Sequence, residues 1–552
     1  MTESPFRYLS NIYGLNHYEL DYPLKNVMKY FGQDMSGLGE LGNFAGRDLY
    51  EIAEHVDRQS KPVHIMWGIN GERVDRALLD PSERWALERL MTEFRVNYHP
   101  YNNGDWHRHF TSIYLVSDPG MGCILTITNQ TAYAISKYGN DKMKDYFEGL
   151  TGQNGKVLYG ATWFTELQGG SDLGQNLVSA AQHNGKWKIS GDTKYFASGG
   201  GLAGVAIVSA RPEGAQEGAK GLGLFLVPEF NESGGRNFKV RRLKEKSGTV
   251  GVPTGEVEFN DSEAFALGDI SKGIYYIMEN LMISRLSNAM AALGIARKAY
   301  LESYYYAQKR VAFGKKLIEH PLILRDLMDM EVYLEGTMAL AFKAVDEFQK
   351  TFGDKPPYSA RYHYARMLTH IAKNLTADMA SYVTRMAMEL HGGLGFLSEF
   401  PIERLHREAL ITPIWEGPSN IQALDMLEAM VKKGSHKTFI AEMELMRKDI
   451  REGMDAFDGS LKSARSSIDF ISSVSGDDPQ FFAKDLVNTL GHTLSAALLI
   501  HMGNVLHLPT MISAGKFYFR RFVERKDYSP GALADCAAIV SVDKPSKEGD
   551  LK

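Results

Sequence analysis

The stretch KWKISGDTKYFASGGGLAGVAIVSA, residues 186–210, decides the fold class because it holds two strand patterns and a glycine-rich turn without an intervening helix. Its first half alternates apolar and polar residues, and AIVSA after the glycines is a short apolar run. The segments GLGLFLVPEF and GEVEFND further along show similar patterns. Strands that follow one another without crossover helices favour a compact antiparallel sheet or barrel over a parallel sheet.

On both sides of this β region, apolar residues recur at a spacing of three and four, which is typical of helices. The order of patterns predicts an α+β, multidomain protein. We expect four parts: a mostly helical N-terminal domain (1–154), the antiparallel β domain (155–272), a helical bundle (273–434) and a C-terminal helical extension (435–552).

Composition excludes several classes of protein. The chain has 552 residues, of which 44% are hydrophobic, with a formal net charge of −5, so disordered, collagen-like and disulfide-scaffold classes do not fit. The two cysteines, Cys123 and Cys536, suit a reducing compartment. The opening residues lack the pattern of a secretory leader, and no stretch approaches the ~18 apolar residues of a membrane span. We expect a soluble cytoplasmic enzyme.

Two motifs in the β region could bind a ring-shaped ligand. FTELQGGSD, residues 164–172, follows an apolar strand and offers backbone N–H groups and the hydroxyls of Thr165 and Ser171. A tight turn with a helix cap is the alternative. In KYFASGGG, Phe196 and Ser198 share a strand face, so a ring could stack while a hydroxyl donates to it. The alternative is a phenylalanine packed in the core.

The glycines at 199–204 match G-x-G-x-x-G, but a strand follows them where a nucleotide-binding fingerprint needs a helix. In KRVAFGKK, a long helix is predicted to end at Gly314, with Arg310 able to face phosphate oxygens or simply to lie at a solvated helix end. MELHGGLGF stops a helix at a glycine pair, which either admits a ligand or caps the helix.

The segment IWEGPSNIQ, residues 414–422, places Glu416 between apolar residues and a Gly-Pro pair. Partial burial there would raise the pKa of the carboxylate and suit it to act as a base, whereas the alternative is an acid near a helix N-terminus. The histidine pairs His107/His109 and His363/His370 lack carboxylate or cysteine companions at ligand spacing, so we expect no metal site.

In their order and spacing, FTELQGGSD, KYFASGG, KRVAFGKK, MELHGGLGF and IWEGPSN resemble the acyl-CoA dehydrogenase superfamily over roughly residues 85–430. TE-x-QGGSD, WEG and the C-terminal helical extension place the chain near the AidB-like branch. The resemblance implies FAD as cofactor and a homo-oligomer, a dimer or a tetramer, in which a neighbouring subunit helps to hold FAD. Pro321, Glu389 and Pro418 depart from residues that are common in the family.

The resemblance also implies roles for individual residues. Glu416 falls on the catalytic base, and Gly417 and Arg285 fall beside the substrate, while Ser171 would touch cofactor or CoA. The further positions implied to bind FAD are Phe164, Thr165, Phe196, Ser198, Arg310, Phe313, Glu389, Gly392, Gly393 and Asn420.

The activity implied is oxidation of an acyl-CoA to a trans-2-enoyl-CoA, within fatty acid metabolism, with an electron-transfer flavoprotein as acceptor. Two alternatives remain open. One is a DNA-associated flavoprotein of the AidB type. Residues 433–552 carry 16 basic and 16 acidic side chains, and a segment without net positive charge does not favour binding to phosphates, so nucleic acid is not an expected partner. The other is an acyl-CoA oxidase that uses O2.

Overall fold

The computed structural model describes residues 9–117 and 120–542. Contacts divide the chain into two compact units, Glu51–Ser287 and the combination of Met1–Tyr50 with Asn288–Lys552. Helix α9 (Gly273–Lys309) contributes residues to both. The predicted α+β architecture, with a β-rich middle region and helical regions before and after it in the sequence, is confirmed. The division into four domains stays a prediction.

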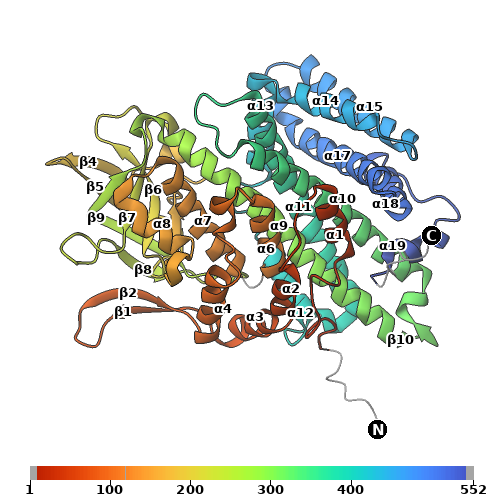
Figure 1. Ribbon diagram of the computed structural model, residues 1–552, viewed down its shortest axis with the longest axis horizontal. Coiled ribbons are helices and arrows are strands. Elements are labelled where there is room, and N and C mark those ends of the chain that lie inside the picture. Colours follow the sequence, from red (N-terminus) through yellow and green to blue (C-terminus); the bar gives the residue numbers. More distant parts are fainter. Residues whose placement is uncertain (1–8, 118–119, 543–552) are drawn as a thin grey trace, which may run out of the picture. The chain divides into compact units, whose positions relative to one another are not determined.

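The unit Glu51–Ser287 is built around a seven-stranded sheet (Figure 1). Its strands are β3 (Gly160–Trp163), β4 (Ser179–His183), β5 (Lys186–Ser198), β6 (Val205–Pro212), β7 (Gly223–Pro228), β8 (Lys239–Leu243) and β9 (Thr254–Ala266). The order is β3-β6-β4-β5-β9-β7, β8 pairs with β9, and β7 also pairs with β6, which closes the path into a barrel. Strand β6 runs parallel to β3 and β4, and the other pairs are antiparallel. The predicted antiparallel barrel is therefore confirmed, with two parallel pairs in addition.

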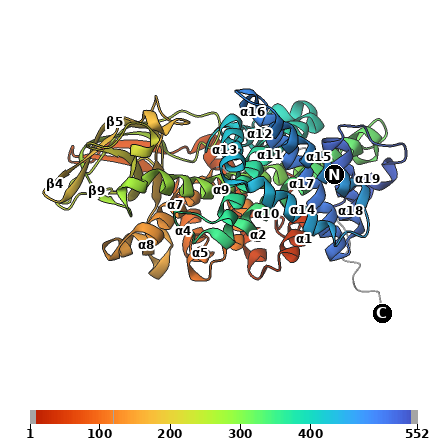
Figure 2. The same ribbon diagram turned by 90° about the horizontal axis from the view of Figure 1, so that it is seen from above.

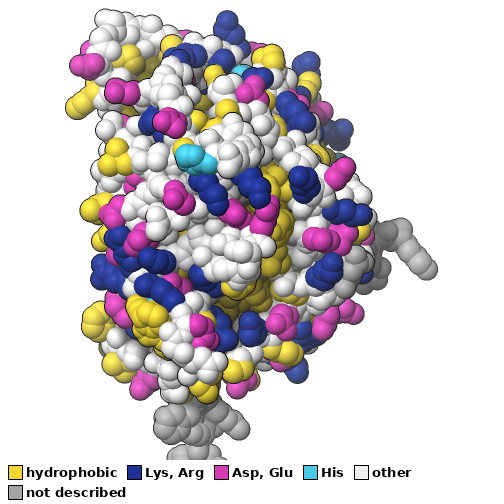
Figure 3. Space-filling model, turned by 90° about the vertical axis from the view of Figure 1, so that its left-hand side faces the viewer, with side chains coloured by type: hydrophobic (Ala, Val, Ile, Leu, Met, Phe, Trp, Pro, Cys, Tyr) yellow, Lys and Arg dark blue, Asp and Glu magenta, His cyan; other side chains and the backbone are white. Residues whose placement is uncertain are grey.

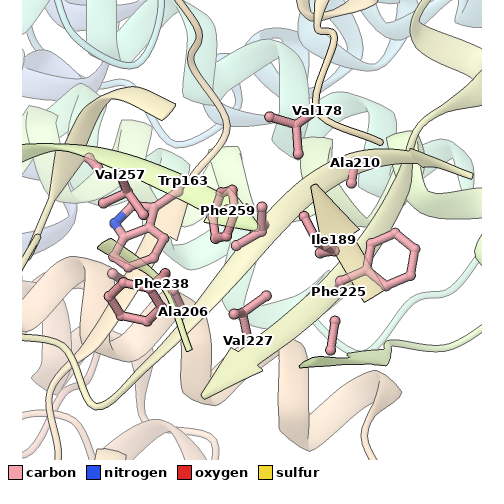
Figure 4. Packing of buried hydrophobic residues seen from close by; sticks show 14 of the residues in the cluster. Trp163, Val178, Ile189, Ala206, Ala210, Phe225, Val227, Phe238, Val257 and Phe259 are labelled. Atoms are coloured by element: carbon pink, nitrogen blue, oxygen red, sulfur yellow. The ribbon is translucent and has the colours of Figure 1, made fainter. Parts of the chain in front are cut away.

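Side chains that point into this barrel form one apolar cluster (Figure 4). Trp163 is fully buried, and its ring meets Phe238 edge to face with centroids 4.9 Å apart. Phe259 and Val257 complete the packing around it. Burying a large apolar side chain contributes roughly 1.5–3 kcal/mol. The cluster therefore fixes β3, and with it the start of the loop 164–172.

Helix α7 (Met121–Tyr138) packs against β3 and β6, and Leu150 of α8 (Lys144–Leu150) belongs to an apolar cluster with residues of β6 and β7. Also in this unit are α4 (Pro81–Thr92), α5 (His99–Asn102) and α6 (Trp106–Val116), of which α4 and α6 contact α7. On α7, the ammonium of Lys137 lies 2.6 Å from the carboxylate of Glu279 on α9, and both side chains are buried. This ion pair joins α7 to the first part of α9.

A hairpin of β1 (Val63–Trp67) and β2 (Arg73–Leu78) interrupts the region that the sequence predicts to be helical. Its strands alternate in character around the turn residues of GINGE, a signal that favours a hairpin. The buried carboxylate of Asp75 accepts from the Val240 N–H at 3.0 Å, which ties the hairpin to β8. The hairpin is a β element within the region 1–154, which the sequence predicts to be mostly helical.

The other unit is helical. Its later helices are α10 (Pro321–Thr351), α11 (Ala360–His391), α12 (Pro401–Ala409), α13 (Ser419–Lys433), α14 (Ser435–Arg447), α15 (Met454–Ser473), α16 (Asp478–Phe481), α17 (Ala483–Leu506), α18 (Pro509–Tyr518), a π-helix (Phe519–Val523) and α19 (Leu533–Val540). Helices α10, α11 and α17 pack together, and α14, α15 and α18 flank them (Figure 2). On α11, Asn374 donates to Asn488 of α17 at 2.7 Å. The C-terminal extension is thus part of this helical unit.

The N-terminal segment also belongs to the helical unit. It contains α1 (Tyr22–Tyr30), α2 (Leu38–Gly46) and the start of α3 (Asp48–Gln59). The buried carboxylate of Glu302 on α9 accepts from Ser10 Oγ, the Asn11 N–H and Tyr50 Oη, each at 2.6 Å. Three donors from the first fifty residues therefore converge on one side chain of α9.

Candidate functional site

The loop 164–172 is fastened to strand β5 from inside the barrel unit. The Glu166 carboxylate accepts from the backbone N–H groups of Leu177 and Val178 at 2.7 and 3.2 Å, and its Oε1 lies 2.7 Å from Lys194 Nζ. In addition, the Tyr195 N–H donates to the carbonyl of Thr165 at 2.9 Å. The loop is therefore held at both its side-chain and its backbone groups.

Glu166 and Lys194 form a buried ion pair. Lys194 is fully buried and Glu166 is 4% exposed. Burial lowers the pKa of Lys194 to about 8, an effect that the nearby Glu166 carboxylate opposes but does not cancel. Lys194 Nζ also donates to the Phe164 carbonyl at 3.3 Å. Neither residue belongs to the set predicted from the sequence, since alternation from Ile189 would place Lys194 on the outward face and only the register shifts in β5 turn it inward.

The predicted ring-binding residues of this unit differ in exposure. Phe196 is 56% exposed on β5, and Ser198 is half-buried two residues on. The register of β5 shifts between Lys194 and Ala197, so the shared strand face stays a prediction. Thr165 is half-buried and Ser171 is exposed. The Phe164 ring packs into an apolar cluster, so a flat ligand could reach little more than its backbone.

One exposed leucine lies in this loop and another follows it. Leu167 is 73% exposed and Leu177 is 77% exposed. Together with Phe196 they give the unit exposed apolar side chains in or next to the same segments of sequence as three hydroxyl groups, a combination that suits a planar heteroaromatic ring. Arg285, on the part of α9 that belongs to this unit, is 3% exposed.

Glu416 lies in a turn of the helical unit, two residues before Pro418, the N-cap residue of α13. Its side chain is half-buried, and its φ of +60° is in the left-handed region, as is the φ of +95° at Gly417. Trp415 Nε1 donates to the side-chain oxygen of Asn288 on α9, and Asn288 Nδ2 donates to the Thr412 carbonyl at 3.0 Å. The turn is therefore anchored on the side that precedes Glu416.

The turn is also anchored by side chains of α11 and α13 that were not predicted from the sequence. Gln422 Nε2 donates to the carbonyls of Glu416 and Gly417, and Lys373 Nζ donates to the Gly417 carbonyl. His370 in turn contacts Gln422. Lys373 on α11 is far from Gly417 in the sequence, so no local pattern predicts their hydrogen bond. The sequence indicates only that His370 and Lys373 share one face of a helix.

The segment KRVAFGKK differs from its prediction. Helix α9 ends at Lys309, not at Gly314, and β10 (Val311–Ala312) pairs with β11 (Lys315–Lys316). Phe313 and Gly314 form the turn with φ of +51° and +81°, values that a right-handed helix cannot contain. Arg310 is exposed, and the Phe313 side chain is 98% exposed.

The glycine pair after α11 is open to solvent. A methyl group added at Gly392 or at Gly393 would have no heavy-atom neighbour within 4 Å among those the structure describes. Glu389, one turn earlier, is exposed and accepts from Arg385 Nη1, which compensates its charge. Asn420 is exposed in the first turn of α13.

On the face of the barrel unit shown in Figure 3, Lys and Arg side chains lie among Asp and Glu side chains. Arg241 on β8 pairs with Glu258 at 3.0 Å, and Lys188 pairs with Glu263 at 3.2 Å. Within residues 9–117 and 120–542, no three His, Cys, Asp or Glu side chains are grouped as metal ligands. No helix in that same part of the chain is long and apolar enough to span a membrane.

Comparisons with known proteins agree with the predicted resemblance. The family model for the acyl-CoA dehydrogenase middle domain matches residues 161–262, and that for the C-terminal domain matches residues 271–431. An acyl-CoA dehydrogenase of Bacillus subtilis is 32% identical over 309 residues, which cover 55% of this chain and 76% of the relative. AidB of Escherichia coli is 31% identical over 293 residues, covering 53% of this chain and 52% of AidB.

Solved structures show the same fold. The crystal structure of Caenorhabditis elegans ACDH-11 in complex with C11-CoA has a TM-score of 0.83 and 24% identity, and the match covers 96% of each chain. An acyl-CoA dehydrogenase from Bacillus anthracis, crystallised with FAD, has a TM-score of 0.66 and 16% identity over 95% of this chain and 87% of its own. The match to ACDH-11 includes the C-terminal helices, which the two family models do not reach.

Proposed function

Because the chain belongs to the acyl-CoA dehydrogenase family, we propose that it binds FAD and oxidises an acyl-CoA thioester to the trans-2-enoyl-CoA. We assign Glu416 as the base. The observation that carries this assignment is the turn itself, where half-buried Glu416 has a φ of +60° and the side chains of Gln422 and Lys373 donate to the carbonyls of Glu416 and Gly417. Strained backbone that its surroundings hold in place is concentrated at functional sites.

The chemistry follows from the weak acidity of a thioester α-proton. A carboxylate oxygen of Glu416 would take that proton, and the electron pair of the broken C–H bond would form the new double bond. The β-hydrogen leaves with its own electron pair, and bound FAD supplies the hydride acceptor. Water must be kept away from the developing charge, so the half-buried Trp415 beside Glu416 suits the site.

The residues of the barrel unit fit the flavin ring. Phe196 offers an exposed aromatic face, and Ser198 and Thr165 offer hydroxyls that donate to or accept from ring nitrogens and carbonyls. We assign Ser171 to cofactor or CoA contact and Arg285 to the neighbourhood of the thioester. Gly417, directly after the base, would lie beside the substrate.

A second set of residues suits FAD held by a partner subunit. Phe313 at the hairpin tip, Arg310 before its first strand, and the open glycines Gly392 and Gly393 expose a ring, a cation and bare backbone. Glu389 and Asn420 are assigned to the same role. We propose that the exposed Phe313 side chain lies at the interface of a homo-oligomer, a dimer or a tetramer.

The electron acceptor that we propose is an electron-transfer flavoprotein, and the location in the cytoplasm stays a prediction. An acyl-CoA oxidase would instead consume O2 in the absence of any added acceptor. A duplex-binding role finds no support in the cluster at 520–526, where Arg521 lies 3.4 Å from Asp329 and Lys526 lies 3.0 Å from Glu524. Cations that are already paired with carboxylates contribute less to the binding of DNA phosphates.

The substitution Glu416→Gln tests the proposed function. The variant should keep bound FAD, seen as an unchanged visible spectrum, while the loss of flavin absorbance on anaerobic mixing with acyl-CoA should slow by about 10²–10⁴-fold. A panel of thioesters of different chain length identifies the substrate for this measurement. Loss of flavin absorbance at the rate of the unaltered protein would show that the base lies elsewhere.

A further inference from the structure

Buried side chains donate hydrogen bonds to the backbone carbonyls of the turn that carries Glu416. Gln422 Nε2 lies 3.0 Å from the Glu416 carbonyl and 2.8 Å from the Gly417 carbonyl. Lys373 Nζ lies 2.8 Å from the same Gly417 oxygen. The side chains of Gln422 and Lys373 are both fully buried. Three hydrogen bonds from inside the protein therefore act on two consecutive peptide groups.

The backbone carbonyls set the orientation of the Gln422 amide, and His370 complements it. The two backbone carbonyls can only accept, so the NH2 group of Gln422 must face them. Its Oε1 then faces His370 Nδ1, 2.9 Å away, and this nitrogen must carry the proton that it donates. His370 and Lys373 lie three residues apart on α11, so one helix face supplies both.

Helix capping does not account for Gln422. The residue lies in the first turn of α13, where a capping side chain would accept from free backbone N–H groups. Gln422 donates instead, to residues that precede the helix. A methyl group at Gly417 would come within 2.9 Å of Gln422 Nε2, so the glycine is needed for this close approach as well as for its positive φ.

We propose that Gln422, Lys373 and His370 are positioning residues that fix the backbone at Glu416 and Gly417 and so aim the Glu416 carboxylate. We call these three residues the carbonyl clamp. This inference rests on the proposed function, in which Glu416 is the base. A displacement of about 1 Å in a reacting group can cost on the order of 10²-fold in rate. Loss of the clamp should therefore reduce proton abstraction far more than it reduces binding of the thioester.

The test uses the FAD-loaded protein with Gln422→Met and, separately, Lys373→Met, which keep side-chain length and remove the donors. The control is Asn374→Ala, which removes a buried hydrogen bond of the same helix that points to Asn488. Proton abstraction is measured by NMR as exchange of the α-protons of phenylacetyl-CoA in D2O, because this thioester has no β-hydrogen to transfer. Backbone order is measured by amide hydrogen exchange and mass spectrometry over residues 411–420 without thioester.

In the clamp variants, α-proton exchange should fall by roughly 10–100-fold at unchanged KM and FAD content, and amide exchange in the turn should rise at least about tenfold. Asn374→Ala should lower the melting temperature and leave both exchange rates unchanged. Lys373→Arg, which keeps a donor, should recover part of the loss. The inference is wrong if the clamp variants exchange the thioester α-protons and the amide protons of the turn at the rates of the unaltered protein. It is also wrong if Asn374→Ala slows α-proton exchange as much as the clamp variants do.

The outcome for Glu416→Gln separates this inference from the proposed function. If Glu416→Gln still exchanges α-protons at the full rate, the proposed base is wrong whatever the clamp variants do. If Glu416→Gln is inactive while Gln422→Met and Lys373→Met are fully active, the base stands and only the clamp is wrong. If one of the clamp variants fails to fold, the other decides between these outcomes.

Discussion

Two short segments carry the residues proposed for chemistry, and the protein holds them by opposite means. In the barrel unit, the loop 164–172 is anchored by a buried carboxylate, Glu166, which accepts from backbone N–H groups and is balanced by Lys194. In the helical unit, the turn at Glu416 is anchored by buried donors that reach backbone carbonyls. The first anchor depends on a buried ion pair, whereas the second holds backbone with positive φ angles in place. Damage to the first should thus appear mainly in stability and damage to the second mainly in rate.

The largest expected effect comes from breaking the ion pair of the loop. Lys194→Met leaves the Glu166 carboxylate buried without its cation, which should lower the free energy of unfolding by about 3–5 kcal/mol. Urea denaturation followed by circular dichroism measures the loss. Lys188→Met on the same strand is the matched control, because its partner Glu263 and Lys188 itself are 20% and 26% exposed, so the loss there should stay below about 1 kcal/mol. Equal losses at the two lysines would mean that burial does not distinguish the pairs.

A second experiment sharpens the comparison with a buried carboxylate that lacks such an anchor. Glu83 on α4 is fully buried, and neither carboxylate oxygen has a hydrogen-bond partner among the described residues. Burial, helped by the nearby Asp80, raises the pKa of Glu83 from 4.5 to about 8. The unfolded chain therefore binds fewer protons than the folded protein between these values, so stability contributed by protonated Glu83 is lost as the pH rises from 4.5 to 8.

The expected slope is a loss of about 1.4 kcal/mol per pH unit in this window. Urea titrations at several pH values measure it, with Glu83→Gln as the control that should be flatter by this amount and more stable at pH 8. A slope that survives in Glu83→Gln would assign the pH dependence to other groups.

The smallest expected effect on stability comes from the turn. Gly417→Ala places a side chain at φ +95° and close to Gln422, and should cost about 1–2 kcal/mol from the backbone conformation alone. Gly434→Ala, at the end of α13, has a similar φ of +67° but only one neighbouring atom, at 3.9 Å. Melting temperatures of the two variants separate conformational cost from contact with Gln422. Identical shifts in melting temperature would mean that contact with Gln422 adds nothing to the cost of a side chain at Gly417.

Much of the fold follows from local patterns. The strand predicted at KWKISGDTKYFAS coincides with β5 (Lys186–Ser198), although its buried positions Ile189, Lys194 and Ala197 do not alternate strictly, because the register shifts within the strand. The end of α9 was placed too late because Val311 and Phe313 are apolar and so continue a helical pattern, whereas positive φ at Phe313 and Gly314 decides the geometry. The hairpin β1–β2 was missed because helical patterns surround it.

The site was predictable only in part, for a physical reason. Glu416 and Gly417 stand out because a carboxylate beside glycine and proline in an apolar frame is unusual within one short segment. Lys373, by contrast, is more than forty positions away in the chain, and its contact with Gly417 depends on how α11 packs. The same holds for Lys194 and Glu166, whose pairing requires the loop to fold back on β5. Spacing along the chain carries no information about such contacts.

The binding of residues 9–50 to α9 has a consequence for how the protein is made. The donors at Ser10, Asn11 and Tyr50 leave the ribosome before the whole unit Glu51–Ser287 is translated, and their acceptor Glu302 follows only after it. At 5–20 residues per second this delay is roughly 10–50 s. During that interval the apolar faces of α1 and α2 have no finished partner, so nascent chains should need shelter from a chaperone until α9 emerges.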